Sequence, residues 1–433
     1  MNLKFSNISS LQFFQLVRFS AFLLIGIAFT KTGLSRNEIG EYETVLFVAG
    51  AVSFFWLNGL IQGLLPLFEK TKAKSAQLFN AFILISFLTV LAILFLIIFN
   101  QSFSSLLLKN SQIPFLKYLL AYLFFSVPAS LVEYIYLLKE KPKQIALYGT
   151  VSFALMLALV CLPAIMGYSF EYCLAGLVLS AGVRYGWLIA LLCKYSIAKF
   201  SYSFLSEYLK LSFPLILSAF LSGSAQYIDG FIVTSHFDEA TFAVFRYGAR
   251  EFPLVLLLAN AFSSAMVHEF SAKENISEIL KRIKSYTTKL MHWLFPLTAI
   301  MMLVSHWLFP IVFNPEFKES ATIFNIYLLL IISRLVFPQT ILTGIRQTGS
   351  IAFASLLEII LNVSLSLWFV TIWGIAGIAY ATVIAYVFEK IFLIIRVKNS
   401  LGICCNKYMN LAIHLTYSLL LLLIFYVIEF VIY

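Results

Sequence analysis

The sequence is poor in charge, cysteine and histidine, and each shortage excludes a class of protein. Asp, Glu, Lys and Arg make up 12% of the 433 residues, about half the share typical of soluble domains. The five cysteines and five histidines show no metal-ligand spacing, so we expect no metal site and no cofactor. No GxxxxGK[ST], GxSxG or HExxH motif occurs, and the predicted loops are short. These absences argue against an ATP-driven pump and against an enzyme.

What the sequence has in place of charge is long apolar runs. Apolar residues make up 61% of the chain, and the mean hydropathy is +0.93. A run of about 20 apolar residues can cross a bilayer as an α-helix. The runs predict an all-α polytopic membrane protein of twelve to fourteen transmembrane helices, with only Trp373-Gly374 dividing two of them. We count thirteen spans, at residues 11–30, 42–67, 78–99, 113–138, 145–166, 170–193, 209–234, 241–267, 290–313, 321–345, 351–372, 374–395 and 411–432.

Lysine and arginine are distributed unevenly between the two ends of these spans. Nineteen of the 30 basic residues fall on the side that holds the N-terminus, five on the other side and six within spans. The positive-inside rule therefore predicts a cytoplasmic N-terminus. The net charge of +10 indicates attraction to anionic lipids and requires no nucleic-acid partner. The first span contains Arg18 and lacks a small-residue cleavage site, so we expect it to be retained.

Two segments share a pattern at a distance of 201 residues. GLSRNEIGEYETVLF at 33–47 and SHFDEATFAVFRYG at 235–248 each carry an acidic outer loop and then resume an apolar helix. This repeat predicts two six-helix bundles, a common plan for transporters. The predicted domains are residues 1–200, residues 201–396, and residues 397–433 as a cytoplasmic loop with an extra helix.

Four segments in register carry a family resemblance. They are LSRNEIGEY after the first span, YIDGFIVTSHFDEATFAVFRYGARE at 227–251, NPEFKESATIFNIYLLLII at 314–332 and WGIAGIAYATVIAY at 373–386. In order and spacing they resemble the O-antigen type, Wzx-like oligosaccharide flippases of the multidrug/oligosaccharidyl-lipid/polysaccharide exporter superfamily. The sequence departs from that pattern at Arg36, where proline is expected, and at Ala243, where tyrosine is expected.

The resemblance implies a flippase of the bacterial inner membrane. Such a protein moves a polyprenyl-diphosphate-linked oligosaccharide from the inner to the outer leaflet, by alternating access to a central cavity between the two bundles. Since no ATP site is present, we expect coupling to H⁺ or Na⁺. The expected partners are the lipid-linked substrate, anionic lipids and the polysaccharide assembly machinery, and the expected state is a monomer.

Two alternatives stay open. A cation-coupled multidrug exporter of the same superfamily would need a more acidic cavity, and six basic residues within spans argue against it. A membrane-embedded polysaccharide polymerase would need a long catalytic outer loop, which the short loops here do not provide.

Charges within the predicted spans are the candidate functional groups. An ion at mid-bilayer costs about 2.5–3.5 kcal/mol on insertion scales, so it normally faces a cavity or a partner. Arginine offers a planar fork of donors that suits a diphosphate. The predicted diphosphate-binding or cavity residues are Arg18, Arg184, Arg250 and Arg334. The predicted ion-coupling or ion-pair residues are Asp229, Arg246, Glu251 and Glu358.

The stretch VFRYGAREFP, residues 244–253, carries the most specific expectation. In a continuous helix Arg246 and Arg250 share one face, with Arg250 one turn deeper. Asp229 lies at a depth similar to that of Arg246, so we expect these two to pair and Arg250 to meet the substrate. Glu251 is then a pairing partner or a coupling carboxylate, and Pro253 predicts a bend.

For two regions near the cytoplasmic side we expect a place at the membrane surface and no role in binding the substrate. Glu389 and Lys390 lie within two turns of a span end, so we expect their charged groups to reach the surface. Residues 268–289 include AKENISEILKRIKSYTTK, which predicts an amphipathic helix lying on the cytoplasmic surface.

Overall fold

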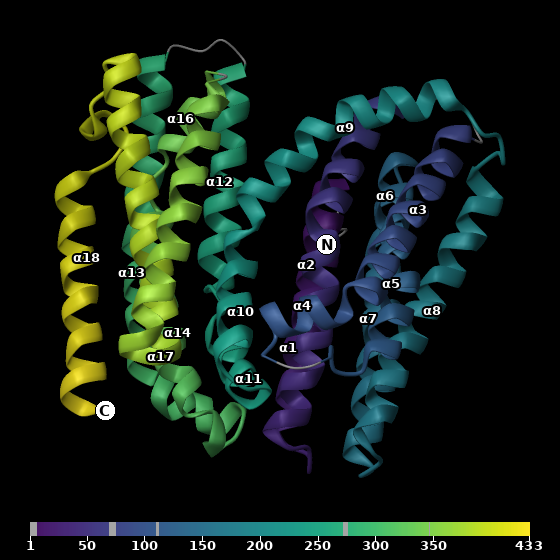
Figure 1. The fold of residues 1–433 in the computed structure, drawn as a ribbon. Helices are drawn as coiled ribbons and strands as arrows, with labels where there is room; N and C mark the ends of the chain where they lie inside the picture. The colour runs from purple at the N-terminus through teal and green to yellow at the C-terminus, as the bar shows by residue number, and fades with distance from the viewer. Residues whose placement is uncertain (1–6, 69–74, 110–111, 272–275, 346) are drawn as a thin grey trace. The chain divides into compact units, whose positions relative to one another are not determined.

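The computed structural model describes residues 7–68, 75–109, 112–271, 276–345 and 347–433, which form helices joined by short loops (Figure 1). Within these ranges the only β-pairing is an isolated bridge between Ser75 and Ser196. Six of the basic residues predicted to be cytoplasmic lie outside the described residues, namely Lys4, Lys70, Lys72, Lys74, Lys273 and Arg346. The chain forms two compact units, unit one with Met1–Gly223 and Thr234–Ala243, and unit two with Ser224–Val233 and Val244–Tyr433.

Unit one begins with a helix pair whose turn follows directly from the sequence. Ser35 precedes the second helix, and its hydroxyl accepts from the Glu38 amide at 3.3 Å while Glu38 Oε2 accepts from the Ser35 amide at 2.8 Å. This reciprocal capping box satisfies amides that the first helical turn leaves without partners. The helices of the unit are α1 Asn7–Thr30, α2 Arg36–Leu67, α3 Ala76–Ile98, α4 Asn100–Leu107, α5 Leu116–Ala129, α6 Leu131–Leu138, α7 Pro142–Ile165, α8 Phe170–Tyr195 and α9 Tyr202–Gly223.

Helix α9 belongs to unit one because it packs closely along α2. A Cβ at Gly59 would lie 2.5 Å from the Ile216 amide nitrogen, so only glycine permits this approach. The Tyr208 hydroxyl donates to the Leu60 carbonyl at 2.8 Å. The predicted domain bounds at residues 200 and 396 describe six-helix bundles, and they stay a prediction.

Unit two contains several broken helices. Its elements are α10 Ala225–His236 and α11 Glu239–Gly248, which each share residues with unit one, then α12 Pro253–Ser271, α13 Ile276–Val312, α14 Glu319–Leu328, α15 Ile331–Arg334, α16 Pro338–Gly344, α17 Thr348–Leu401, α18 Leu411–Tyr426 and the π-helical end of α18 at Val427–Ile432.

Helix α17 is two antiparallel arms that meet at Gly374. This glycine has φ 57° and ψ −137°, a conformation that residues with a Cβ rarely adopt. Ser355 donates to Glu389 at 3.0 Å, Asn362 to Thr382 at 3.4 Å and Arg396 to Ser350 at 3.3 Å, so the arms run side by side in opposite directions. The predicted division at Trp373-Gly374 is confirmed.

The number of membrane-spanning helices agrees with a polytopic protein. The described residues contain ten helices long and apolar enough to cross a membrane, or twelve when each of two bent helix pairs is one span. Counting the two arms of α17 separately brings the number to thirteen, as the hydropathy pattern predicts. The chain is an all-α, multi-pass membrane protein.

Two predicted spans are broken by proline. Glu239–Gly248 and Pro253–Val267 meet at 55°, and Glu319–Arg334 and Pro338–Gly344 meet at 46°. Proline lacks an amide hydrogen and disfavours helical conformation in the residue before it. The bend expected at Pro253 is therefore present. The expectation that Arg246 and Arg250 share a face of one continuous helix is wrong, because α11 ends at Gly248.

The predicted surface helix over residues 268–289 takes a different form. Residues 268–271 are the end of α12, and residues 272–275 lie outside the described residues. Residues 276–289 are the first part of α13, which continues to Val312. Ile279 and Ile283 are buried on its inner face, and Lys284 donates to the Asn406 carbonyl at 2.7 Å. The segment is therefore part of a longer helix and not a separate surface helix, because its apolar face is buried within unit two.

Candidate functional site

The predicted site residues are distributed over both units. Arg18 and Arg184 belong to unit one, in helices α1 and α8. The other six belong to unit two, namely Asp229, Arg246, Arg250, Glu251, Arg334 and Glu358.

Arg18 is an exposed cation in the middle of a span. It lies nine residues after Ser9, where the apolar span begins, which is about 14 Å along the axis at a rise of about 1.5 Å per residue. Within the part of the chain that the structure describes, its electrostatic contacts are with Glu133 and Tyr134. Such a position is costly in lipid, so the guanidinium is expected to face water or an anion.

Arg184 is held by aromatic residues of unit one. Its Nε donates to the Tyr148 hydroxyl at 3.0 Å, and its guanidinium lies 5.4 Å from the centroid of the Phe153 ring. Phe14, one turn before Arg18, stacks on Tyr148 with centroids 5.9 Å apart. Tyr148 therefore links the helix of Arg18 with the side chain of Arg184.

Glu133 supplies the carboxylate of this cluster, although the sequence pattern assigns it no specific role. It is buried in α6 and interacts electrostatically with both Arg184 and Arg18. Its Oε2 has no hydrogen-bond partner among the described residues. The signal in the sequence was a single glutamate inside the span at 113–138, which does not reveal its neighbours. Arg18, Glu133 and Arg184 together form a polar cluster with two cations and one anion, here named the Arg18 cluster.

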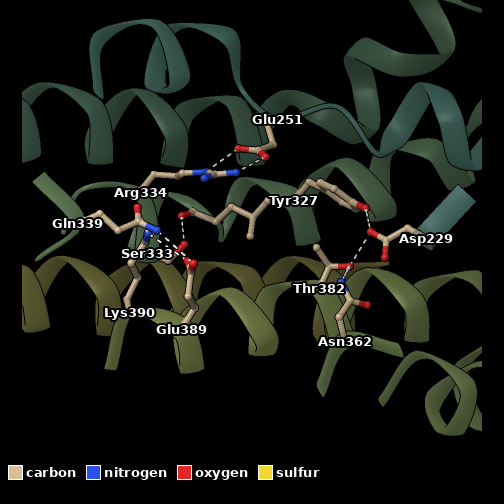
Figure 2. A network of polar contacts seen from close by, with 11 residues as sticks. Asp229, Glu251, Tyr327, Ser333, Arg334, Gln339, Asn362, Thr382, Glu389 and Lys390 are labelled. Carbon is tan, nitrogen blue, oxygen red and sulfur yellow. Dashed lines mark hydrogen bonds and ion pairs between the residues drawn. The ribbon is translucent and has the colours of Figure 1, made fainter. Parts of the chain in front are cut away.

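In unit two, Arg334 and Glu251 form a bidentate ion pair. Arg334 Nε donates to Glu251 Oε2 at 2.8 Å, and Nη2 donates to Oε1 at 2.5 Å (Figure 2). The guanidinium also lies 4.5 Å from the centroid of the Tyr386 ring. Glu251 stands in the break after α11 and Arg334 at the end of α15, so the pair joins the two bends.

This ion pair changes the roles expected for Arg334 and Glu251. The donor fork of Arg334 that was predicted to bind a diphosphate is occupied by a carboxylate, and Glu251 is its pairing partner. A pocket beside the pair is lined by Phe252, Val255 and Leu328 among others and has room for about one water molecule.

Asp229 has other partners than the predicted one. Tyr327 and Thr382 donate their hydroxyl hydrogens to Asp229 Oδ2 at 2.7 and 2.6 Å (Figure 2). Its Oδ1 has no hydrogen-bond partner among the described residues. The predicted Asp229–Arg246 ion pair is therefore wrong, because the hydroxyl groups of Tyr327 in α14 and Thr382 in the second arm of α17 are the partners of this carboxylate.

Glu358 is a second buried carboxylate near Asp229. It lies one turn before Asn362 on the first arm of α17 and is 4% exposed. It interacts electrostatically with Asp229 and Glu389, and its Oε1 has no hydrogen-bond partner among the described residues. Two buried carboxylate oxygens without donors, beside Thr382 and Asn362, are the kind of oxygen set that takes a proton or a small cation.

Glu389 and Lys390 do not reach the surface. Both are buried, and Lys390 Nζ lies 3.2 Å from Glu389 Oε2 and 2.7 Å from Gln339 Oε1. Gln339 and Ser355 donate to Glu389 at 3.1 and 3.0 Å. The expectation of surface-directed side chains is wrong, because neighbours within unit two satisfy both charges (Figure 2).

Arg246 and Arg250 lie on either side of the end of α11. Arg246 is half-buried in the last turn of that helix, and Arg250 is half-buried in the break that follows. Arg250 Nε lies 3.4 Å from the Arg246 carbonyl, and its guanidinium lies 5.4 Å from the centroid of the Tyr247 ring. The role of Arg250 as a substrate ligand stays a prediction.

The sequence of the chain matches one protein family over residues 34–322, the family described as polysaccharide biosynthesis protein. The chain belongs to this family. The family model covers more than half of the chain, from the loop after α1 into α14, and confirms the resemblance carried by the four sequence segments. The comparison with curated proteins finds no match.

Solved structures of several transporters share the fold. The lipid II flippase MurJ in an inward closed conformation is similar with a TM-score of 0.69 at 17% identity, over 97% of this chain and 93% of that chain. An inward-facing multidrug resistance MATE family transporter of the MOP superfamily gives 0.65 at 14%, over 91% and 98%. A MOP superfamily transporter from Pyrococcus furiosus gives 0.59 at 15%, over 90% and 94%. At these identities the likeness shows the fold of this membrane protein.

Proposed function

We propose that the protein is a flippase that moves a polyprenyl-diphosphate-linked oligosaccharide from the inner to the outer leaflet. Membership of the polysaccharide biosynthesis protein family and the fold shared with a lipid II flippase support this proposal. The same two findings support the proposal that the protein lies in the bacterial inner membrane and is a transporter, not an enzyme.

The observation that carries the proposal is the Arg18 cluster. A mid-span, exposed guanidinium with a second arginine nearby gives unit one an excess of positive charge inside the membrane. Such a site attracts a diphosphate and repels the cationic compounds that a multidrug exporter carries. The cluster therefore favours the flippase over the multidrug exporter, whose fold is shared.

The test in cells replaces Arg18 and Arg250 by alanine, in a strain that needs the polymer. Each charged hydrogen bond is worth about 1.5–3 kcal/mol, so we expect the double variant to lower polymer output by more than about tenfold. Arg396→Ala is the matched control, because Arg396 is an exposed arginine whose Nε contacts Ser350 at 3.3 Å. Normal polymer output in the double variant, at wild-type protein level, would contradict the proposal that these arginines bind the diphosphate.

A reconstituted assay separates the two transport classes. Proteoliposomes are loaded with a fluorescent polyprenyl-diphosphate oligosaccharide, and its exposure at the outer face is measured with a membrane-impermeant quencher. A cationic dye is the competing substrate. We expect Arg18-dependent movement of the diphosphate and none of the dye; Arg18-independent export of the dye alone would support the multidrug exporter.

We further propose that Asp229 and Glu358 form the ion-coupling site. Each has one buried oxygen without a donor among the described residues. Asp229 is hydrogen-bonded to Thr382 and Tyr327, and Glu358 interacts electrostatically with Asp229. No three His, Cys, Asp or Glu side chains gather at metal-binding distance in the described part of the chain. A weakly held H⁺ or Na⁺ suits two carboxylates with neutral oxygen donors better than a transition metal does.

The coupling proposal is tested by imposing Na⁺ or H⁺ gradients across the same proteoliposomes. We expect Asp229→Asn to lower the gradient-dependent part of the transport rate by about tenfold and to leave substrate binding unchanged. Asp238→Asn is the control, because Asp238 is a loop carboxylate whose pKa the Thr241 side chain and amide already hold below the usual range. Equal loss in both variants, or full stimulation in Asp229→Asn, contradicts the assignment.

A further inference from the structure

Three lysine ammonium groups surround one tyrosine ring at an end of unit one. Lys141 Nζ lies 5.1 Å from the centroid of the Tyr195 ring and donates to its hydroxyl at 2.7 Å. Lys194 Nζ lies 5.5 Å and Lys139 Nζ 5.7 Å from the same centroid. Lys139 also lies 5.0 Å from the Phe68 ring. Each distance is within the range of a cation–π contact.

The local sequence builds this arrangement. In the segment KEKP, Lys139 directly follows α6 as its C-cap, Glu140 adopts φ 54°, and Lys141 stands before Pro142, the first residue of α7. The chain reverses within these residues, which places both lysines beside the end of α8. The Tyr195 backbone is fixed as well, because its carbonyl accepts from the Ser75 amide at 2.9 Å.

The cluster concentrates positive charge where the side chains are partly withdrawn from water. Lys139 and Lys141 are half-buried, and Lys194 is exposed. Burial lowers the pKa of Lys139, and the Lys141 charge lowers it further, against the opposing effect of Tyr195. The effect of Lys141 on Lys139 shows that the like charges beside this ring repel one another, and a further anion beside them weakens that repulsion.

Tyr195 contributes a donor to the same place. Its hydroxyl oxygen accepts from Lys141, and the hydroxyl hydrogen has no acceptor among the residues that the structure describes. A phosphate group presents three acceptor oxygens and takes charge-assisted hydrogen bonds from ammonium and hydroxyl donors. Ammonium and hydroxyl donors gathered at one aromatic ring therefore match a phosphate better than they match a monovalent carboxylate.

We propose that Lys139, Lys141, Lys194 and Tyr195 form a binding site for a membrane-borne phosphate group at the predicted cytoplasmic surface. An anionic lipid headgroup and the diphosphate of a polyprenyl carrier share this chemistry. The inference goes beyond the proposed transport function and does not depend on it, because a headgroup of the bulk lipid would satisfy the same donors.

The experiment uses the full-length protein in nanodiscs of phosphatidylcholine, with three probes added separately. The probes are phosphatidylglycerol, undecaprenyl diphosphate and inorganic pyrophosphate, and their binding is measured by native mass spectrometry and by thermal shift. The site variant is Lys139→Gln with Lys141→Gln. The matched control is Lys143→Gln with Lys199→Gln, two exposed lysines from the same end of unit one that lose the same charge.

The site variant is expected to weaken binding of at least one lipid probe by about tenfold, and the control by less than about twofold. Tyr195→Phe keeps the ring and removes the hydroxyl, so we expect it to lose less binding than the site variant. An unchanged melting temperature in pure phosphatidylcholine shows that its fold is intact. Loss for phosphatidylglycerol assigns the site to bulk lipid, and loss for undecaprenyl diphosphate alone assigns it to the carrier. Equal binding by site and control variants with every probe, or loss for pyrophosphate alone, overturns the proposal.

Discussion

The Glu251–Arg334 ion pair is the contact whose removal has the most predictable consequence. The variants are Glu251→Gln and Arg334→Gln, alone and combined. Both side chains are 22% exposed, and two hydrogen bonds join them at 2.8 and 2.5 Å. Each single variant leaves one charge beside the bends of unit two without its counter-ion.

The expected energy lies between two limits. Breaking a fully buried pair costs about 3–5 kcal/mol, whereas exposed pairs couple by about 0.2–1 kcal/mol. Polar contacts within membrane proteins reach about 1.7 kcal/mol in measured cycles. The bidentate geometry and the partial exposure place the coupling at about 2 kcal/mol. The Tyr386 ring, 4.5 Å from the guanidinium, continues to hold Arg334 in the Glu251 variant.

A double-mutant cycle measures this coupling. The free energy of unfolding is obtained by denaturant titration in detergent micelles for the wild type, both single variants and the double variant. Arg282 and Glu269 provide the control cycle, since their contact is a single one at 3.3 Å with side chains 44% and 27% exposed. We expect that control pair to couple by about 0.5 kcal/mol or less.

Two results would refute the reasoning about this pair. A coupling energy no larger than that of Arg282–Glu269 would mean that the bidentate contact does not persist in the membrane protein. Additive single variants with normal stability would show that each charge has another partner. A large coupling together with normal transport would instead confine the pair to a structural role at the two bends.

Three further predictions concern other parts of the chain. Gly374→Ala is expected to cost about 1–3 kcal/mol of stability, because alanine is strained at φ 57° and ψ −137°; Gly349→Ala, where a Cβ meets open space, is the control, and equal melting temperatures would contradict the strain. Asn80→Ala removes two hydrogen bonds, at 2.8 and 2.9 Å, to the segment between α8 and α9, which costs that segment about 1–3 kcal/mol of local stability. We expect limited proteolysis to cleave the segment faster, and an unchanged cleavage rate would contradict this role of Asn80. Glu429→Gln loses the carboxylate that contacts His306 at 2.7 Å, and we expect a lower melting temperature that a His306→Gln background does not lower further; additive shifts would argue against the pair.

Several features could be predicted from the sequence because they depend on local composition. Apolar runs of bilayer length predict the spans, and Trp373-Gly374 marks the turn between the arms of α17 because glycine tolerates the required dihedral angles. Pro253 likewise indicates a bend near Arg250. The order of four short segments was sufficient for the family resemblance, which the match over residues 34–322 confirms.

The candidate site was predicted less completely, because partners depend on packing between distant segments. The sequence shows which spans contain Asp229, Glu251 and Arg334, and the membrane cost of a charge makes each of them notable. It does not show that Glu251 meets Arg334, 83 positions away, or that Asp229 meets Thr382, 153 positions away. The Asp229–Arg246 pair was inferred from similar depth, and depth alone does not choose a neighbour.

By itself the sequence determined that the chain crosses the membrane many times as helices, since hydropathy and backbone propensity act over a few residues. Only the tertiary structure decided which charges are neutralised within the protein and which stay exposed. Arg334 is bound by Glu251 and Lys390 by Glu389, whereas Arg18 stays exposed in the middle of α1. The reason is physical: the free energy of a charge inside a membrane is set by the groups that packing brings within a few ångströms, not by its neighbours along the chain.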